Sequence, residues 1–364
     1  MQYRKARIEA LQQRMRERRL DVAFVSPSAD MEYLIGGRLP LTERLNQLVI
    51  PAEGDCSLVV PKLQLPLVAE LRGDIDIQIW DEDISPLDLV ARLAPKGAQR
   101  AAVDGHMWAT FVLGLQERLP GASFTDVSPL LSAARICKED GEIDILQEAA
   151  QRFDAIWTTF FERGRLLGRS EYQIANDIRD LILEHGFDSV LWCDVGGGPN
   201  GASPLHHGSQ RVVEPGDPVV IDFAASYKGY VMDTCRTPVA GEAAPEFVAI
   251  YDIVNKAYEA GLEAVQPGSK AESVDHAARK IIEDAGFGVN FLHRLGHGLG
   301  LDAHEEPYIV KGNEQLLRPG MVFSNEPGIY VPGKWGVRIE NIVVVTEDGS
   351  RSLSQLTREL VSMH

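Results

Sequence analysis

The chain has 364 residues, of which 45% are hydrophobic and 24% are charged, an ordinary composition for a globular protein with a sizeable core. Its length favours two domains over one. The formal net charge of −17 argues against nucleic acid as a partner, because binding to phosphates needs a basic face.

The sequence shows neither a membrane segment nor a secretion signal. No apolar run approaches the roughly 18 residues that a membrane-spanning helix needs, and the residues after Met1 lead directly into a charged amphipathic pattern. The four cysteines have no CxxC spacing and are typical of reduced thiols. We therefore expect a cytoplasmic protein with no membrane partner.

The first third of the chain alternates between helix-like and strand-like segments. Residues 4–19 predict an amphipathic helix. Strands are predicted at 22–25, 48–50, 58–60 and 75–80. This pattern indicates an α/β domain with a partly parallel or mixed sheet, and it contains no catalytic cluster. A charged segment with a glycine, 132–142, marks the boundary, so we expect domains at 1–135 and 136–364.

The remaining two thirds predict an α+β domain with long helices. The second of these helices begins at a capping box, Ser170–Gln173, and ends at Gly186. The other helices are predicted at 142–167, 245–265 and 272–285. Two loops, 193–210 and 293–308, are rich in glycine, histidine and proline.

An internal repeat relates the two halves of this domain. Residues 181–187 are echoed 100 positions later by residues 281–287. Pro215-Gly216 precedes Asp222 by the same spacing as Pro319-Gly320 precedes Glu326. The repeat predicts a pseudo-two-fold domain, in which the acidic residues of both halves face one central cavity.

Four acidic residues form two pairs around predicted hairpin turns. A hairpin centred between residues 227 and 228 sets Asp222 opposite Asp233, and one centred on Gly333 sets Glu326 opposite Glu340. Directly opposed residues have Cβ atoms about 4.5–5.5 Å apart. Apolar runs flank both pairs, so we expect the carboxylates to be at least partly buried. Like charges that close need a cation, and two divalent metal ions are the simplest solution.

A histidine cluster supplies a fifth candidate ligand. His297 lies between glycines in the run 296–300, where the backbone leaves the imidazole exposed to a site. His293 and His304 bracket it within twelve residues. Two aspartates, two glutamates and one histidine give mostly oxygen ligation, which suits Mn²⁺, Co²⁺ or Zn²⁺. The zinc-protease pattern HExxH is absent.

Five ordered segments resemble the signature blocks of the Xaa-Pro peptidase family, which includes prolidase, aminopeptidase P and creatinase-like proteins. The segments are 220–224, 232–237, 296–300, 325–330 and 338–341. Residues 20–25 and 33–37 resemble the creatinase-type N-terminal domain of that family. The resemblance implies a creatinase-like N-terminal domain and a C-terminal "pita-bread" catalytic domain that cleaves short proline-containing peptides, and it also implies a homodimer.

The resemblance also implies roles for single residues. Two metal ions would be bound by Asp222, Asp233, His297, Glu326 and Glu340. Glu326 would double as the proton shuttle, and His304 and His206 would hold the substrate and stabilise the oxyanion. His293 would line the pocket near the carboxylate end of the substrate, and Arg338 would orient a carboxylate ligand. The loop at 205–208 is about one residue short of the family's usual spacing before Pro215-Gly216, so His207 is the alternative to His206.

Several alternatives stay open at this stage. Ala224 stands where the family usually has glycine and Cys235 where it usually has threonine, which affects the surroundings of the ligands. A creatinase-type small-molecule hydrolase or lyase would use the same fold, and so would a binding module that has lost catalysis. The sequence does not decide between a dipeptidase and an aminopeptidase.

Overall fold

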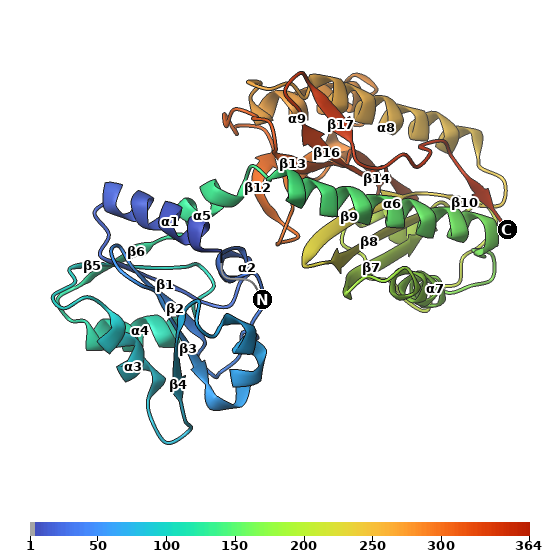
Figure 1. Ribbon diagram of the computed structural model, residues 1–364. Helices are drawn as coiled ribbons and strands as arrows, with labels where there is room; N and C mark the ends of the chain where they lie inside the picture. Colours follow the sequence, from blue (N-terminus) through green and yellow to red (C-terminus); the bar gives the residue numbers. More distant parts are fainter. Residues whose placement is uncertain (1–3) are drawn as a thin grey trace. The chain divides into compact units, whose positions relative to one another are not determined.

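The computed structural model describes residues 4–364, and these form two compact units that divide between Arg135 and Ile136 (Figure 1). Each unit has a sheet system of its own. No helix within the described residues is long and apolar enough to cross a membrane.

The N-terminal unit is built on a six-stranded mixed sheet with the strand order β4-β3-β2-β1-β5-β6. Strand β2 is antiparallel to both of its neighbours, and the other pairings are parallel. The strands are β1 (Val22–Val25), β2 (Gln47–Pro51), β3 (Ser57–Pro61), β4 (Asp76–Trp80), β5 (Arg100–Val103) and β6 (Ser123–Asp126). The prediction of a mixed α/β sheet is confirmed.

Helices and one 3-10 segment complete the N-terminal unit. They are α1 (Lys5–Glu17), α2 (Ala29–Ile35), η1 (Lys62–Leu71), α3 (Pro86–Leu93), α4 (Ala109–Arg118) and α5 (Ser128–Arg135). Helix α1 buries Ile8, Leu11 and Met15, which lie on one face at spacings of three and four residues. Helix α2 begins at Ser28, whose side chain caps the first turn, and ends at Gly36 with a φ of 68°.

The two main sheets of the C-terminal unit, one of three strands and one of five, are each covered by a pair of helices (Figure 1), and two further sheets, β10-β18 and β14-β15, have two strands each. The first half contains α6 (Asp140–Arg163), α7 (Glu171–Glu184), β7 (Ser189–Gly197), η2 (Gly198–Ala202), β8 (Val219–Tyr227), β9 (Tyr230–Arg236) and β10 (Val239–Ala240). Strands β7, β8 and β9 form one sheet. The capping box Ser170–Gln173 is present at the start of α7, as predicted. Helix α6 ends at Arg163 rather than at 167, because Gly164 takes an extended backbone.

The second half repeats the arrangement. It contains α8 (Pro245–Ala264), α9 (Ala271–Asp284), η3 (Gly288–Asn290), β11 (Gly296–Gly298), β12 (Glu305–Ile309), β13 (Val322–Asn325), β14 (Gly328–Val331), β15 (Trp335–Arg338), β16 (Asn341–Val345), β17 (Ser350–Ser352) and β18 (Ser362–Met363). Its larger sheet has the order β12-β11-β13-β16-β17, and β14 and β15 form a separate hairpin. Helices α8 and α9 lie side by side, as Figure 1 shows.

Matching hydrogen bonds in the two halves confirm the internal repeat. The N–H of Gly168 donates to the carbonyl of Val213, and 100 residues later the N–H of Gly268 donates to the carbonyl of Leu317. Helix α7 is followed by Gly186 with a φ of 77°, and α9 is followed by Gly286 with a φ of 86°. Both are left-handed conformations that glycine adopts without strain. The two halves therefore end their helices and enter their hairpins in the same way.

The first acidic hairpin has a different register from the predicted one. Its turn consists of Lys228 and Gly229, both with positive φ, so the hairpin is centred one residue later than expected. Asp222 consequently lies opposite Cys235, and Asp233 lies opposite Ala224. The predicted direct opposition of the two aspartates is wrong. The shift moves both strands together, so the two side chains still lie on the same face of the sheet.

The second acidic hairpin has the predicted register. Gly328 pairs with Arg338 in β14 and β15, and Asn325 pairs with Asn341 in β13 and β16. These pairs enclose Glu326 and Glu340 and follow one continuous register centred on Gly333. The N–H of Glu340 donates to the carbonyl of Cys235 at 3.1 Å, which links the two halves beside the acidic residues.

Candidate metal centre

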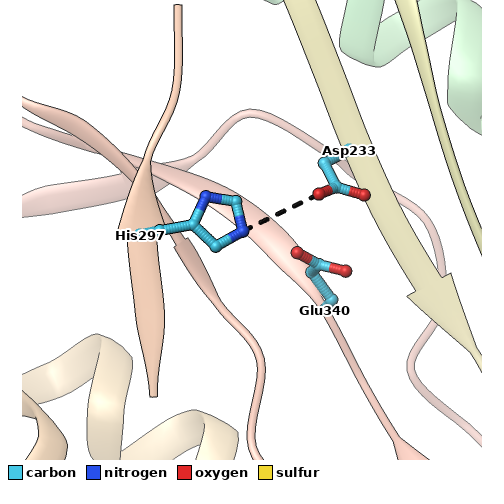
Figure 2. Close-up of side chains that lie close together, drawn as sticks. All are labelled: Asp233, His297 and Glu340. Carbon is cyan, nitrogen blue, oxygen red and sulfur yellow. Dashed lines mark ion pairs between the residues drawn. The ribbon is translucent and has the colours of Figure 1, made fainter. Parts of the chain in front are cut away.

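Three side chains from separate segments converge in the interior of the C-terminal unit. Asp233 comes from β9, His297 from β11, and Glu340 from the position just before β16 (Figure 2). One potential ligand atom from each of them lies within 4.8 Å of the other two. The Nε2 atom of His297 is 3.8 Å from a carboxylate oxygen of Asp233. All three side chains are buried, and Glu340 is only 1% exposed.

Three of the four carboxylate oxygens in this cluster have no hydrogen-bond partner among the described residues. Both carboxylate oxygens of Glu340 and Oδ1 of Asp233 are buried without a hydrogen-bond partner among the described residues. Burial, and then the charge of Asp222, raises the pKa of Asp233 well above its usual value. Burial, and then the charge of Asp233, does the same to the pKa of Glu340. Buried carboxylates without donors are strongly unfavourable unless a cation neutralises them, so this donor set fits a divalent metal ion.

The other two predicted ligands lie at the edge of the same cluster. An oxygen of Glu326 is 3.3 Å from Nε2 of His297 and accepts a hydrogen bond from the Ser324 hydroxyl at 3.0 Å. The carboxylate of Asp222 accepts hydrogen bonds from Trp192 at 2.5 Å and from Arg338. The ion pair between Arg338 and Asp222 is consistent with the expectation that Arg338 orients a carboxylate ligand.

A cavity of about 660 Å³ opens onto the cluster. Its lining residues are Trp192, Asp194, Pro204, Leu205, His207, Asp222, Asp233, Leu292, His293, Arg294, His297, His304, Glu326 and Arg338. The ring of His304 stacks on Trp192 and lies 4.1 Å from the ring of His297, between centroids. Burial lowers the pKa of both histidines to about 4, and the positive charge of Arg294 acts in the same direction. Both imidazoles are therefore neutral at pH 7.

His293 belongs to a chain of directed hydrogen bonds. Its Nδ1 atom lies 2.7 Å from the carbonyl of Arg294, which can only accept, so Nδ1 carries the proton. Burial lowers the pKa of His293, so the ring is neutral and its Nε2 atom accepts from the Tyr330 hydroxyl at 2.9 Å. The Tyr330 oxygen in turn accepts from Arg338 at 2.7 Å. His293 lines the cavity, and both of its ring nitrogens are already occupied.

The two histidines of the 193–210 loop face different surroundings. His207 lines the cavity and its Nδ1 atom is 3.0 Å from Asp194. His206 is not among the lining residues, and its Nε2 atom instead lies 2.8 Å from Glu171. Asp194 pairs directly with Asp222 across β7 and β8.

The carboxylate of Glu171 anchors this loop through hydrogen bonds. Its fully buried carboxylate accepts hydrogen bonds from the Gly197 N–H, the Asn200 amide, the Ser209 hydroxyl and His206, at 2.7–2.9 Å. Burial alone would raise the pKa of Glu171, but these hydrogen bonds outweigh burial and hold the pKa below its usual value. The cavity wall that contains His207 is therefore tied to the first residue of α7.

Replacing Glu171 with alanine should loosen this loop. The change leaves several buried donors without an acceptor, so we expect a loss of roughly 3 kcal/mol in unfolding free energy, and about 1 kcal/mol for Glu171→Gln. Amide hydrogen exchange at Gly197 measures the loop directly. Glu184→Ala, at an exposed glutamate of the same helix, is the control. Unchanged protection of Gly197 in Glu171→Ala would contradict the expectation.

Sequence reasoning assigned no role to three of these residues. Asp194 lies near the start of the 193–210 segment, Arg294 follows His293, and Glu171 lies inside the predicted capping box. Their positions next to recognised motifs were the available signal. Local sequence does not determine where these side chains point or which partners they contact, because both depend on contacts between distant strands and loops.

The fold and the buried ligand cluster define a metal-dependent enzyme, and comparisons with known proteins agree. The model of metallopeptidase family M24 matches residues 144–347, and that of the creatinase/prolidase N-terminal domain matches residues 7–137. The chain belongs to metallopeptidase family M24. Its C-terminal unit is the pita-bread catalytic domain, and its N-terminal unit is creatinase-like. Membership of this family implies that the enzyme uses divalent metal ions.

Similar proteins cover nearly the whole chain. A protein of Mycobacterium tuberculosis named probable dipeptidase PepE is 40% identical over 93% of this chain and 90% of its own length. The Xaa-Pro dipeptidase of Lactobacillus helveticus is 33% identical over 97% of this chain and 98% of its own. The crystal structure of a prolidase from Thermococcus sibiricus superimposes with a TM-score of 0.94 at 37% identity, covering both chains completely.

Proposed function

We propose that this peptidase cleaves the Xaa-Pro bond of short peptides with the help of two divalent metal ions. The observation that carries the proposal is the convergence of Asp233, His297 and Glu340, with oxygens that have no partner among the described residues, beside a cavity of about 660 Å³ that Asp233 and His297 line. The names of similar proteins, Xaa-Pro dipeptidase and prolidase, support the substrate class.

The five acidic and histidine side chains are assigned to the metal ions as follows. Asp233, His297 and Glu340 form the compact part of the site and would hold the ions. Asp222 and Glu326, at the edge of the same cluster, would supply the remaining ligands. The ion pair of Asp222 with Arg338 orients its carboxylate for this purpose. Mn²⁺, Co²⁺ and Zn²⁺ all suit the donor set.

The bound ions supply a Lewis acid for the peptide carbonyl and an activated water. Within the protein, Glu326 is suited to move the proton. Its carboxylate lines the cavity with 14% of the side chain exposed, whereas Glu340 is sealed. Glu326 would take a proton from the attacking water and pass it to the proline nitrogen, which is a poor leaving group until it is protonated.

Two histidines are assigned to the substrate. His304 is neutral, stacks on Trp192 and lies over His297, so its imidazole can hydrogen-bond to the carbonyl under attack. We assign the role of the second histidine to His207, because it lines the cavity, whereas His206 is held by Glu171. His206 would act indirectly, by fixing the loop.

A substrate panel tests the proposed function. Purified protein is loaded with Mn²⁺, Co²⁺ or Zn²⁺ and assayed with Ala-Pro, Gly-Pro, Ala-Ala and Ala-Pro-Ala, and with creatine as a probe of creatinase-type chemistry. We expect cleavage of Ala-Pro and Gly-Pro, loss of activity with a chelator, and recovery on adding metal. Cleavage of Ala-Ala in preference to Ala-Pro would overturn the Xaa-Pro assignment.

A further inference from the structure

Trp192 reaches the candidate metal centre because its strand contains a β-bulge. The register of β7 on β8 shifts between Val190 and Trp192, so Leu191 is an extra residue in the strand. Trp192 then lies opposite Ala224, which is two residues from Asp222 in β8. Side chains two residues apart lie on the same face of a sheet. The bulge therefore places the Trp192 side chain on the face that carries Asp222, where it lines the cavity.

The indole N–H of Trp192 fixes one oxygen of a candidate metal ligand. It donates to Oδ1 of Asp222 at 2.5 Å, while Arg338 donates to Oδ2 of the same carboxylate. A carboxylate oxygen has two lone pairs, so each oxygen keeps one that a metal ion can use. Donors on both oxygens hold the plane of the carboxylate, which a single ion pair leaves free to rotate. Trp192 thus stands where an outer partner orients a metal ligand.

The face of the same indole restrains a second residue of the site. The imidazole of His304 stacks on it, with 5.8 Å between the ring centres and 16° between the ring planes. His304 is exposed, and its side chain has no hydrogen bond to any of residues 4–364. Its contact with His297 is tilted, with 47° between the ring planes. Stacking on the indole of Trp192 therefore sets the plane of the His304 ring.

We propose that Trp192 is a positioning residue with two separable tasks: its N–H orients Asp222 for metal binding, and its ring orients His304 towards the substrate. The inference rests on the proposed function for the roles of Asp222 and His304. The two tasks use different atoms of one side chain, so different substitutions should remove them independently. Loss of the N–H should weaken metal binding, and loss of the ring should slow turnover in protein that is saturated with metal.

Two variants separate the N–H of Trp192 from its ring. Trp192→Phe keeps an aromatic ring without a donor, and Trp192→Gln keeps an N–H donor without a ring. Metal-free protein is titrated calorimetrically with Mn²⁺. We expect the Kd of Mn²⁺ to rise by about 10- to 100-fold in Trp192→Phe, the usual cost of losing an outer partner, and to stay close to the wild-type value in Trp192→Gln. An unchanged Kd in Trp192→Phe would overturn the inference, whereas a wild type that binds no Mn²⁺ would count against the proposed function.

The second measurement is the turnover of Ala-Pro at saturating Mn²⁺, where a weakened metal site no longer limits the rate. Trp192→Phe should then recover a kcat close to that of the wild type. Trp192→Gln should lose about 10- to 100-fold in kcat, because small displacements of a group beside the reacting carbonyl are costly, and KM should change less. If both variants lose metal affinity and kcat to the same extent, Trp192 has only a general structural role and the inference is wrong.

A spectroscopic measurement tests the ring contact without turnover. The ring protons of His304 lie in the ring current of the indole, and comparison with His304→Gln assigns their NMR signals in metal-free protein. In Trp192→Gln these signals should move to the positions of an unstacked histidine, and in Trp192→Phe they should move much less. Signals that stay in place in Trp192→Gln would refute the ring contact, even if the wild type does not cleave Ala-Pro, a result that counts against the proposed function alone.

Trp108→Phe is the matched control for these measurements. It makes the same chemical change at a tryptophan of the N-terminal unit whose side chain is 40% exposed and does not line the cavity. We expect the Kd of Mn²⁺, kcat and the His304 signals of Trp108→Phe to match those of the wild type. An equal loss of Mn²⁺ affinity in Trp108→Phe and Trp192→Phe would show that the effect is not specific to Trp192 and would overturn the inference.

Discussion

Replacing Glu340 with glutamine should abolish metal-dependent activity and at the same time stabilise the metal-free protein. In the metal-free protein the Glu340 carboxylate is buried beside Asp233 and has no hydrogen-bond donor within residues 4–364. Glutamine removes one of two crowded negative charges, and its amide can donate to the unpartnered oxygen of Asp233. A gain of about 1–3 kcal/mol in unfolding free energy is expected.

The same substitution removes the stabilisation that metal ions provide. A ligand that binds only the folded state adds about 2.7 kcal/mol at a free concentration of 100 times its Kd. Wild-type protein should show this as a rise in Tm when Mn²⁺ is added. Glu340→Gln should show little or no rise, and its activity should fall by roughly a thousandfold or more, because losing a direct ligand exceeds the 10- to 100-fold cost of losing an outer partner.

Thermal unfolding with and without metal, together with metal analysis, checks both effects. Glu263→Gln, at an exposed glutamate of α8, is the control and should behave like the wild type. The pKa of Glu340 is raised in the folded protein. The loss of unfolding free energy that this carboxyl group causes is therefore absent below its pKa in the unfolded chain, and it grows as pH rises towards its pKa in the folded protein. The stability advantage of Glu340→Gln should therefore shrink as pH is lowered. An unchanged metal-induced Tm shift would rule out Glu340 as a ligand.

Replacing Glu326 with glutamine should slow catalysis while leaving metal in the protein. The Glu326 side chain lines the cavity, and its carboxylate lies 3.3 Å from Nε2 of His297 and accepts a hydrogen bond from Ser324. The side-chain amide of the introduced glutamine cannot take up a proton from water, so we expect kcat to fall by about 10²- to 10⁴-fold, the usual contribution of general acid–base catalysis. Retention of most of the metal would distinguish this variant from Glu340→Gln.

The measurement combines steady-state kinetics with metal analysis of the same preparations. KM for Ala-Pro should change much less than kcat, since the proton transfer occurs in the transition state. The fall in kcat should persist at saturating metal, which separates slow proton transfer from weak metal binding. Full activity of Glu326→Gln would refute the shuttle role.

The repeats and acidic hairpins show how far local patterns determine structure. The second hairpin follows the predicted register because its turn is centred on Gly333, which adopts the positive φ that the turn needs. The first hairpin differs because Lys228, a residue with no obvious preference for positive φ, joins Gly229 in a two-residue turn. The turn geometry shifts the pairing of the two strands by one residue. Side chains alternate between the two faces of a sheet along each strand, so Asp222 and Asp233 stay on the same face.

The amino-acid sequence by itself determined the mixed α/β and α+β fold classes, the repeat, and the metal-ligand candidates, because each depends on periodicity or on spacing within one segment. The tertiary structure alone decided that Asp222 is held by Arg338, that His207 and not His206 lines the cavity, and that Arg294 lies over Tyr308. These choices depend on side chains from distant strands and loops competing for the same partners, and no local pattern specifies the outcome.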